Sequence, residues 1–328
     1  MKPALNFIFN PMIKNKICFL LIPFLVALLP SCTKQTVSSS SSMILTGISM
    51  SKSSEIVCID IDSGMVVNTT PINCYVLGSS VYDPRSGGYG YVGCDSVFKL
   101  VNPLTGELIK SFKVPGGLSQ TVIDSHDNML IGRYTTISYE DDPDTVYTKS
   151  VTAGAPIYTN YVIRVDLATG TIVSQNQVDL GDGAFLCSNF YDPVIKGYVL
   201  LRSDYKLITI NPSTGAIIKS TDIGKPVGNI VYNTDNNTLI GMTYSYDTDR
   251  NYVEVIDTET GAQISKKEIK QRDDYYLCIS GYDAESNCYL AVNYPQNNVL
   301  FINISTGEID KSYKLDNPMN DIKFWRGR

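Results

Sequence analysis

A short apolar run followed by a polar turn recurs six times along the chain. Each copy has a β-branched residue, then Asp or Asn, and, four residues after that Asp or Asn, a Gly preceded by Ser or Thr. In the copy 97–112 this pattern predicts two short strands joined by a tight turn. The Asn side chain caps backbone N–H groups of the turn, and the Gly supplies the positive φ that closes it. The six turns are Asp60–Gly64, Asn102–Gly106, Asp166–Gly170, Asn211–Gly215, Asp257–Gly261 and Asn303–Gly307.

A second hairpin precedes this one, as at Tyr82–Pro84, so each unit contains four antiparallel strands. The turn glycines lie 42, 64, 45, 46 and 46 residues apart. Four strands in a repeat of about 40–50 residues is the period of a β-propeller. Helical periodicity is absent from any stretch longer than the apolar run near the N-terminus. The sequence therefore predicts an all-β, six-bladed β-propeller of four-stranded antiparallel blades.

The two ends of the repeat array predict how the ring closes. The first unit supplies three strands, at 43–48, 55–60 and 65–67, and lacks an innermost one. The segment Asn320–Trp325 resembles the innermost strand of the other units. We expect this C-terminal strand to join the first blade, because that pairing removes two exposed edges. Phe324 and Trp325 are then expected to stabilise the fold rather than to bind a ligand.

The segment Asn251–Gly261, with the sequence NYVEVIDTETG, resembles the repeats of YVTN/YncE-like and PQQ-repeat-like propellers. This resemblance covers residues 43–325 and implies the blade architecture, but it says little about activity, because propellers carry many functions. Quinoprotein dehydrogenases of related repeat type bind PQQ with Trp-rich blades and adjacent cysteines. The chain has one Trp and no Cys-Cys pair, so no cofactor is expected.

The first 42 residues predict export and anchoring. Residues 1–31 have a basic start and an apolar run, Ile17–Leu29, that is too short for a spanning helix and is typical of a secretory signal. Ser31 followed by Cys32 resembles the lipobox of bacterial lipoproteins, which implies a lipid on Cys32; an ordinary cleaved signal is the alternative. Residues 32–42 are rich in Ser and predict a flexible tether to the propeller domain, residues 43–328.

Charge and the tether composition favour a cell-envelope location. Removing residues 1–31 takes away three lysines and no acids, so the mature chain has 24 basic and 33 acidic residues, a net charge of −9. An acidic domain without basic clusters argues against nucleic acid as a partner. Residues 33–42 lack the acidic export signal of many surface lipoproteins, which favours the outer membrane facing the periplasm; surface exposure is the alternative. The expected partners are the membrane and an unknown small molecule, glycan or envelope protein.

Six cysteines remain beyond Cys32. Most are expected to be buried as small hydrophobic residues, because Cys187 and Cys278 occupy the same repeat position. Cys278 and Cys288 flank a predicted hairpin, so a disulfide across that hairpin is the alternative.

The 64-residue interval contains an insertion of about 23 residues between the second and third strands of its blade, roughly Arg133–Tyr158. This connection is expected on the face that carries the loops between successive blades, which is the usual binding face of propellers. A lid or recognition loop is favoured, and an acidic disordered flap is the alternative. Candidate ligand-binding residues are the aromatic and charged residues of this face: Arg133, Tyr134, Tyr139, Tyr158, Arg202, Tyr205, Tyr244, Tyr246, Arg272, Asp274, Tyr275 and Tyr294.

Catalysis finds little support in the sequence. The single histidine, His126, lies in a predicted turn on the opposite face, which argues against a His-based triad or a multi-His metal site. We therefore expect a non-enzymatic envelope lipoprotein, without metal or cofactor, that binds its ligand on the loop-rich face. One alternative is a carbohydrate- or lactone-active hydrolase or lyase that uses carboxylates such as Asp273 and Asp274. Another, implied by resemblance to surface lipoproteins with similar propellers, is a corrinoid-capturing accessory protein of an outer-membrane uptake system.

Overall fold

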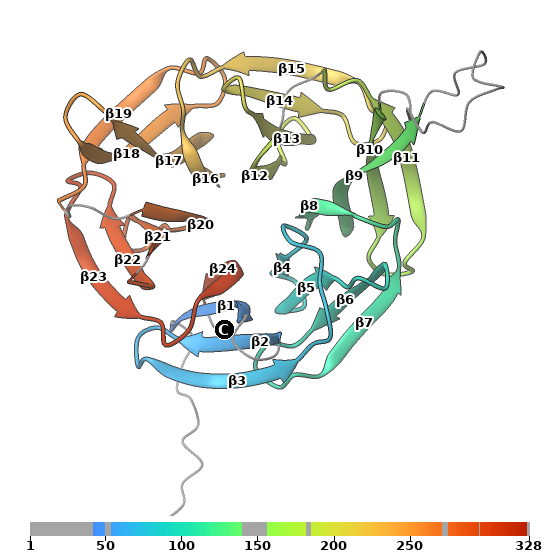
Figure 1. Ribbon diagram of the computed structural model, residues 1–328, viewed down its shortest axis with the longest axis horizontal. Helices are drawn as coiled ribbons and strands as arrows, with labels where there is room; N and C mark the ends of the chain where they lie inside the picture. The colour runs from blue at the N-terminus through green and yellow to red at the C-terminus, as the bar shows by residue number, and fades with distance from the viewer. Residues whose placement is uncertain are drawn as a thin grey trace, which may run out of the picture. The chain divides into compact units, whose positions relative to one another are not determined.

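The structure is a computed structural model that describes residues 42–49, 54–139, 156–181, 185–270, 275–294 and 296–326. These residues form twenty-four strands, β1 to β24, in six four-stranded sheets. The sheets are arranged as blades around a common centre (Figure 1), which confirms the predicted six-bladed propeller. Within the described ranges, no helix is long and apolar enough to cross a membrane.

Each blade is antiparallel, and its innermost strand is given first here. Blade 1 contains β24 (Met319–Arg326), β1 (Met43–Ser49), β2 (Glu55–Asp60) and β3 (Met65–Pro71). Blade 2 contains β4 (Val81–Asp83), β5 (Gly88–Val92), β6 (Val97–Val101) and β7 (Leu108–Lys113). Blade 3 contains β8 (Ser119–Asp124), β9 (Met129–Tyr139), β10 (Pro156–Asp166) and β11 (Ile172–Val178).

The second half of the ring repeats this order. Blade 4 contains β12 (Phe185–Asp192), β13 (Gly197–Arg202), β14 (Lys206–Ile210) and β15 (Ile217–Asp222). Blade 5 contains β16 (Gly228–Asn233), β17 (Thr238–Ser245), β18 (Arg250–Asp257) and β19 (Gln263–Glu268). Blade 6 contains β20 (Tyr275–Asp283), β21 (Cys288–Tyr294), β22 (Asn298–Asn303) and β23 (Ile309–Lys314).

The hydrophobic core lies between successive blades rather than inside one sheet. Every residue of β1 and β5 is buried, because both faces of these second strands are covered by neighbouring blades. From Ile109 to Lys113 of the outer strand β7, exposed and half-buried residues alternate, because only one face packs against a neighbour. Stability therefore depends on contacts between repeats, as in other repeat proteins.

The six repeat turns explain why a Gly recurs. Each turn glycine has a φ between 72° and 79°, as its sequence predicted. Each also lies against the outer strand of the preceding blade, where an added Cβ would come within 2.0 to 2.8 Å of an existing atom. Outer-strand side chains bind the same turns: Lys110 Nζ donates to the carbonyl oxygen of Leu167 at 2.6 Å, and Lys219 Nζ to that of Glu259 at 2.6 Å. The motif therefore closes a hairpin and joins two blades.

The C-terminal strand closes the ring as predicted. β24 pairs antiparallel with β1, and Trp325 is only 8 % exposed. The Trp325 ring stacks on Tyr82 of blade 2 with 4.9 Å between ring centroids, and its Nε1 donates to Thr46 Oγ1 at 3.0 Å. Arg326 forms two hydrogen bonds with the Asp283 carboxylate of blade 6, at 3.0 and 2.6 Å. Blade 1 is thus held to both of its neighbours by its last strand.

The disulfide in the structure is not the Cys278–Cys288 bridge that the sequence left open as an alternative. A disulfide joins Cys74, in the loop between β3 and β4, to Cys94, in the turn between β5 and β6. Cys288 is a free, buried thiol, which excludes the Cys278–Cys288 bridge. Cys58 is also free, and burial raises the pKa of its thiol to about 11. Sequence spacing could not identify the Cys74–Cys94 pair, because Cys74 lies in the loop that leads into blade 2 and Cys94 in a turn within that blade, and the two do not flank one hairpin.

Candidate functional site

The strand connections fall on two faces of the ring. The repeat turns and the hairpins between first and second strands define the turn face. The connections between second and third strands, such as 93–96, and those between blades, such as 72–80, define the loop face. Contacts between connections of these last two kinds include the Cys74–Cys94 disulfide and the 2.9 Å hydrogen bond from the Val114 N–H to the carbonyl oxygen of Ser96.

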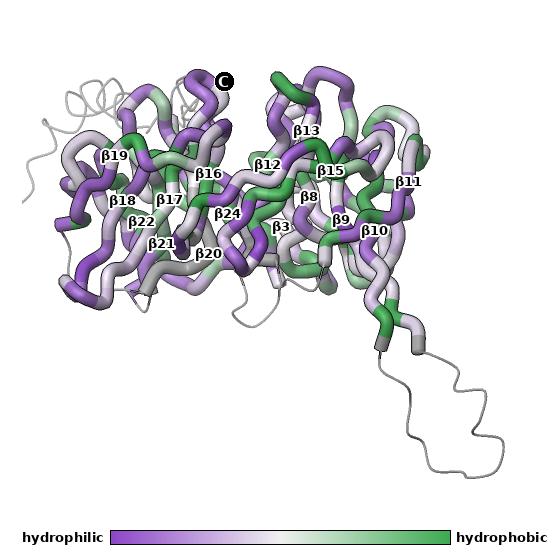
Figure 2. Tube along the Cα trace, turned by 90° about the horizontal axis from the view of Figure 1, so that it is seen from above, coloured by the Kyte–Doolittle hydropathy of each residue, from purple (hydrophilic) through white to green (hydrophobic). Residues whose placement is uncertain are grey.

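The insertion in blade 3 extends two strands into a projecting hairpin. The ladder between β9 and β10 continues to Tyr139 opposite Pro156. Pairing of β8 with β9 ends at Arg133, and pairing of β10 with β11 ends at Asn160. Beyond those points the two strands pair only with each other and project from the ring (Figure 2). We call residues 135–139 and 156–160 the arm; residues 140–155 lie outside the described residues.

The arm changes the boundaries expected for the insertion. Residues 133–139 and 156–158 were expected to be loop, whereas the structure places them in strands. Their β-branched and aromatic side chains, at 135–137 and 157–159, favour a strand, which the loop interpretation overlooked. The insertion thus begins and ends with a continuation of two strands of the blade, β9 and β10.

Tyr134 and Arg133 at the base of the arm have structural contacts. Tyr134 is 8 % exposed and stacks on Tyr161 with 5.0 Å between centroids, within the core shared by blades 2 and 3. Arg133 donates from Nε to Gln120 Oε1 at 2.8 Å and from Nη1 to Asn160 Oδ1 at 2.6 Å. Burial lowers the pKa of the Arg133 guanidinium. Both residues connect the arm to the ring, and Tyr134 is not accessible on the loop face.

The outer part of the arm exposes apolar side chains. Ile137 and Tyr158 are directly opposite each other in the ladder and are 56 % and 62 % exposed. Ile157 is 43 % exposed. Tyr139 lies at the end of β9, and its side chain is outside the described set. The arm therefore carries an exposed aromatic–aliphatic pair, Ile137 and Tyr158, and neither residue belongs to a described core cluster.

The candidate residues of blade 4 make contacts within the protein, whereas those of blade 5 are exposed. Arg202 binds the Asp204 carboxylate with two hydrogen bonds, at 2.7 and 2.5 Å, which lower the pKa of Asp204 to about 2. Tyr205 has a φ of 64° and packs against the core between blades 4 and 5. In blade 5, Tyr244 and Tyr246 are 43 % and 89 % exposed and meet edge to face at 4.9 Å. The exposed candidates are thus on the arm and on the β17–β18 hairpin.

Four further candidates, in and next to blade 6, remain predictions. Arg272 and Asp274 lie outside the described residues. Tyr275 and Tyr294 are paired at the ends of β20 and β21, which places them at the same end of blade 6, but their side chains are not part of the described set.

Two charged residues at the centre of the ring were missed by sequence reasoning. Asp321 and Lys323 lie on β24, the innermost strand of blade 1. Both carboxylate oxygens of Asp321 accept from the backbone N–H of Gly78 at 3.1 Å, and burial raises the pKa of this carboxyl. Burial lowers the pKa of the Lys323 ammonium, an effect that Asp321 opposes. Comparison of the six innermost strands would have identified Lys323, as argued below.

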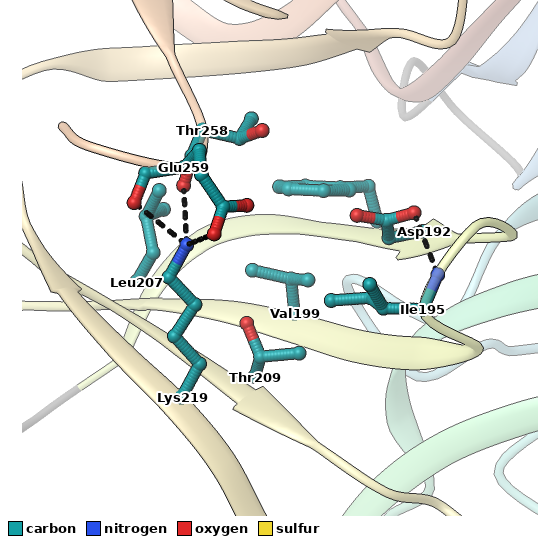
Figure 3. Close-up of a pocket in the computed structure, with 9 residues that line it drawn as sticks. Asp192, Ile195, Val199, Leu207, Thr209, Lys219, Thr258 and Glu259 are labelled. Atoms are coloured by element: carbon teal, nitrogen blue, oxygen red, sulfur yellow. Dashed lines mark hydrogen bonds and ion pairs between the residues drawn. The ribbon is translucent and has the colours of Figure 1, made fainter. Parts of the chain in front are cut away.

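A small cavity lies between blades 4 and 5. It has a volume of about 20 Å³ and is lined by Asp192, Val199, Leu207 and Thr209, among others. Lys219 lies beside it and binds Glu259 of the next blade, with its Nζ 3.1 Å from Glu259 Oε1 (Figure 3). A single water needs about 10–15 Å³ of such volume. This cavity therefore has room for about one water and not for an organic ligand.

The described residues offer no metal centre: none of their His, Cys, Asp and Glu side chains form a cluster of three or more that could hold an ion. His126 lies in the turn between β8 and β9, on the turn face, and its Nδ1 is 2.6 Å from Asp127 Oδ1.

Comparison with known proteins relates the chain to others by fold. No protein-family model and no curated protein sequence matches it. A protein of unknown function from Bacteroides caccae is 12% identical, with a TM-score of 0.61, and the match covers 87% of this chain and 99% of that chain. The beta-propeller domain of Cps50 (Swd1) from Myceliophteria thermophila is 10% identical, with a TM-score of 0.51, and the match covers 86% of this chain and 88% of that chain. These similarities show the β-propeller fold and no particular activity.

Proposed function

We propose that the protein is a non-enzymatic, lipid-anchored protein of the cell envelope that binds a small molecule, glycan or partner protein on the loop face. The observation that carries this proposal is the exposure of aromatic side chains on two projections of that face. These are Tyr158 on the arm and the Tyr244–Tyr246 pair on the β17–β18 hairpin. Tyrosine supplies rigid, amphipathic contact area at low entropic cost.

The fold does not require the arm. The equivalent connections of other blades are short, as at Gly93–Ser96 and Ser203–Tyr205. A long connection in a compact domain commonly has a function, since it adds ordering cost without adding to the blade ladder. An isolated two-stranded hairpin with exposed Ile137 and Tyr158 gains stability when a partner covers it.

The disulfide supports export. Cys74 and Cys94 are exposed, and exposed disulfides persist in oxidising compartments such as the periplasm or the cell surface. This agrees with a signal at residues 1–31 and a lipid on Cys32, in an outer-membrane protein of the YVTN/YncE-like type.

Ion pairing supports binding over acid–base chemistry. Asp204 is paired with Arg202, Asp283 with Arg326, and Glu254 with two lysines. Cationic partners lower the pKa of each of the paired carboxyls Asp204 and Glu254, whereas a general acid needs a raised pKa.

The test separates the arm from its base. Residues 136–159 are replaced by a short Gly-Ser turn, which keeps Arg133, Tyr134 and Tyr161; a second variant is Tyr244→Ser with Tyr246→Ser. The full-length protein is screened by thermal shift against oligosaccharides, corrinoids and divalent cations. We expect a compound that stabilises the wild type and is recovered unchanged to bind at least one variant about tenfold more weakly or worse. Full-strength binding to both variants would contradict this face, and turnover of the compound would favour a hydrolase or lyase.

A further inference from the structure

Lys323 breaks the repeat of the innermost strands. It pairs with Thr46 of β1, one residue before Phe324, which is paired with Leu45. The same register position holds an apolar residue or glycine in the five other blades. Those residues are Val81, Val122, Phe190, Val231 and Gly281, paired with Gly90, Ile131, Val199, Ile240 and Leu290 respectively.

The fold does not need a charge at this position. An ammonium taken partly out of water loses hydration free energy unless a partner compensates it. Five blades form the same strand pair with uncharged side chains, so packing alone does not explain a lysine here. In repeat proteins, a local departure from an otherwise consistent pattern is where a functional residue is expected.

The neighbours of Lys323 leave its charge without a bonded partner. Ile322 and Phe324 belong to the core cluster shared with blade 6, so Lys323 projects from the opposite face of β24, on the side where Trp325 stacks on Tyr82. The Lys323 side chain is half-buried, and within the described part of the chain no residue forms a hydrogen bond or ion pair with it. Asp321 acts on it only through the longer-range attraction between the two charges.

Asp321 already has hydrogen-bond partners in the protein. Its carboxylate oxygens both face the Gly78 N–H, and its backbone carbonyl accepts from Ser80 Oγ at 3.1 Å and from Tyr89 at 2.7 Å. Burial raises the pKa of Asp321, and both of its carboxylate oxygens are already directed at a backbone N–H. The site around Lys323 therefore favours an incoming anion over an incoming cation.

We propose that Lys323 is the anion-recognising residue of a ligand site at the centre of the ring, and that the ligand carries a carboxylate or phosphate group. This inference deepens the proposed binding function and rests on it. The bound anion supplies the charge-assisted hydrogen bond that the ammonium lacks. It adds a residue at the ring centre to the arm and the β17–β18 hairpin, which lie farther out in the blades.

Anion binding is tested on the full-length protein in detergent. The probes are inorganic phosphate and citrate, titrated at an ionic strength held constant with chloride, and the readout is the melting temperature. Lys323→Met removes the charge and keeps the length of the side chain, while Lys323→Arg keeps the charge. Lys219→Met is the matched control, because Lys219 is also partly buried but is paired with Glu259 on the turn face.

We expect at least one anion to raise the melting temperature of the wild type, Lys323→Arg and Lys219→Met by a few degrees in a saturable way, because a ligand that binds only the folded state stabilises it. The same anion should leave Lys323→Met unshifted. An equal shift in Lys323→Met, or no shift in the wild type with either anion, would overturn the inference. Labelling with acetic anhydride, read by mass spectrometry, gives a second measure: the anion should slow modification of Lys323 and leave that of Lys219 unchanged.

The arm-replaced protein separates the two proposals. It should keep the anion-dependent shift, because Lys323 and the arm are on different blades. If the shift depends on Lys323 while the arm and tyrosine variants bind at full strength, the loop-face proposal fails and the Lys323 site stands. If the anion shift does not depend on Lys323 while the arm or tyrosine variants lose ligand binding, the Lys323 site fails and the loop-face proposal stands.

Discussion

The hydroxyl of Tyr198 in blade 4 donates a 2.6 Å hydrogen bond to the carbonyl oxygen of Gln120 in blade 3. Gln120 has a φ of 50° at a bulge of its innermost strand, where the carbonyl leaves the ladder. Tyr89 and Tyr289 make the same bond, to Asp321 at 2.7 Å and to Asn229 at 2.5 Å. The equivalent residues of the other three blades are Leu45, Leu130 and Leu239. This tyrosine bond therefore occurs at every second seam: between blades 1 and 2, blades 3 and 4, and blades 5 and 6.

The tyrosine hydrogen bond should contribute more to stability between blades 5 and 6 than between blades 3 and 4. Tyr289→Phe removes the hydroxyl from the Asn229 carbonyl and should lower the free energy of unfolding by about 1–3 kcal/mol. Tyr198→Phe should cost less, because Asn189 Nδ2 also donates to the Gln120 carbonyl, at 2.8 Å. Urea denaturation measures both, with the exposed Tyr158→Phe as the control. Equal losses in the two buried variants would show that the second donor does not compensate.

Two glycines with similar φ allow the cost of a left-handed backbone to be compared with the cost of a steric clash between blades. Gly224 has a φ of 67° and nothing within 4 Å of an added Cβ, whereas Gly307 has a φ of 79° and the Glu268 carbonyl oxygen 2.0 Å from that position. Gly224→Ala should cost about 1–2 kcal/mol, the penalty of a left-handed conformation. Gly307→Ala should cost clearly more, because blade 6 must move away from blade 5. Chemical denaturation that gives the same loss for both would refute a role of the repeat turns in joining blades.

Glu254 should give the protein part of its acid sensitivity. Its side chain is fully buried, and burial alone would raise its pKa, but hydrogen bonds from Lys225, Thr243 and Lys266 outweigh that effect and lower the pKa below the ordinary 4.5. A carboxyl with a lowered folded-state pKa stabilises the protein above its unfolded-state pKa, and this contribution is lost as the pH falls through the folded-state value. Glu254→Gln should therefore destabilise the protein near neutral pH and flatten the fall in stability below about pH 4.5.

Unfolding free energies measured from pH 7 to pH 3 test the role of Glu254. Asp95→Asn is the control, because Asp95 forms an exposed pair with Lys99. A Glu254→Gln protein whose stability falls with pH as steeply as that of the wild type would contradict the prediction.

Removal of the closing strand β24 should strongly destabilise the protein. Truncation before Met319 removes Trp325, its stack on Tyr82 and the Arg326–Asp283 bonds. Loss of a buried Trp alone typically costs about 3–5 kcal/mol, a large share of domain stability. Removal of residues 327–328 alone is the control and should change little. An unchanged melting temperature after the longer truncation would contradict ring closure by β24.

Cys32→Ala should release the protein from membranes without changing its melting temperature. The acyl chain is expected on Cys32, and residues 33–42 separate it from the first strand, which begins at Met43. Membrane fractions washed with high salt and probed for the protein measure the release. Retention of the variant after washing would show that another segment anchors it.

The sequence by itself determined the fold, because its information is local and repeated. Each turn from Asp or Asn to Gly reports its own hairpin, and the spacing of the turns gives four strands per blade and six blades. The place of Trp325 in the closing strand followed from its likeness to the other innermost strands. Tyr158 and Tyr244 were expected in connections of the loop face; both lie in strands, β10 and β17, and their side chains are exposed.

Only the tertiary structure decided what happens between blades. Tyr134 is buried in the core shared by blades 2 and 3, and Trp325 is buried where it stacks on Tyr82 of blade 2. The pairing of Cys74 with Cys94 likewise depends on which connections meet on one face. That Lys323 has no bonded partner among the described residues depends on the orientation of β24 beside blade 2. A repeat motif specifies how one blade folds, whereas the residues that meet across a seam come from distant parts of the chain, and local propensity contains no information about them.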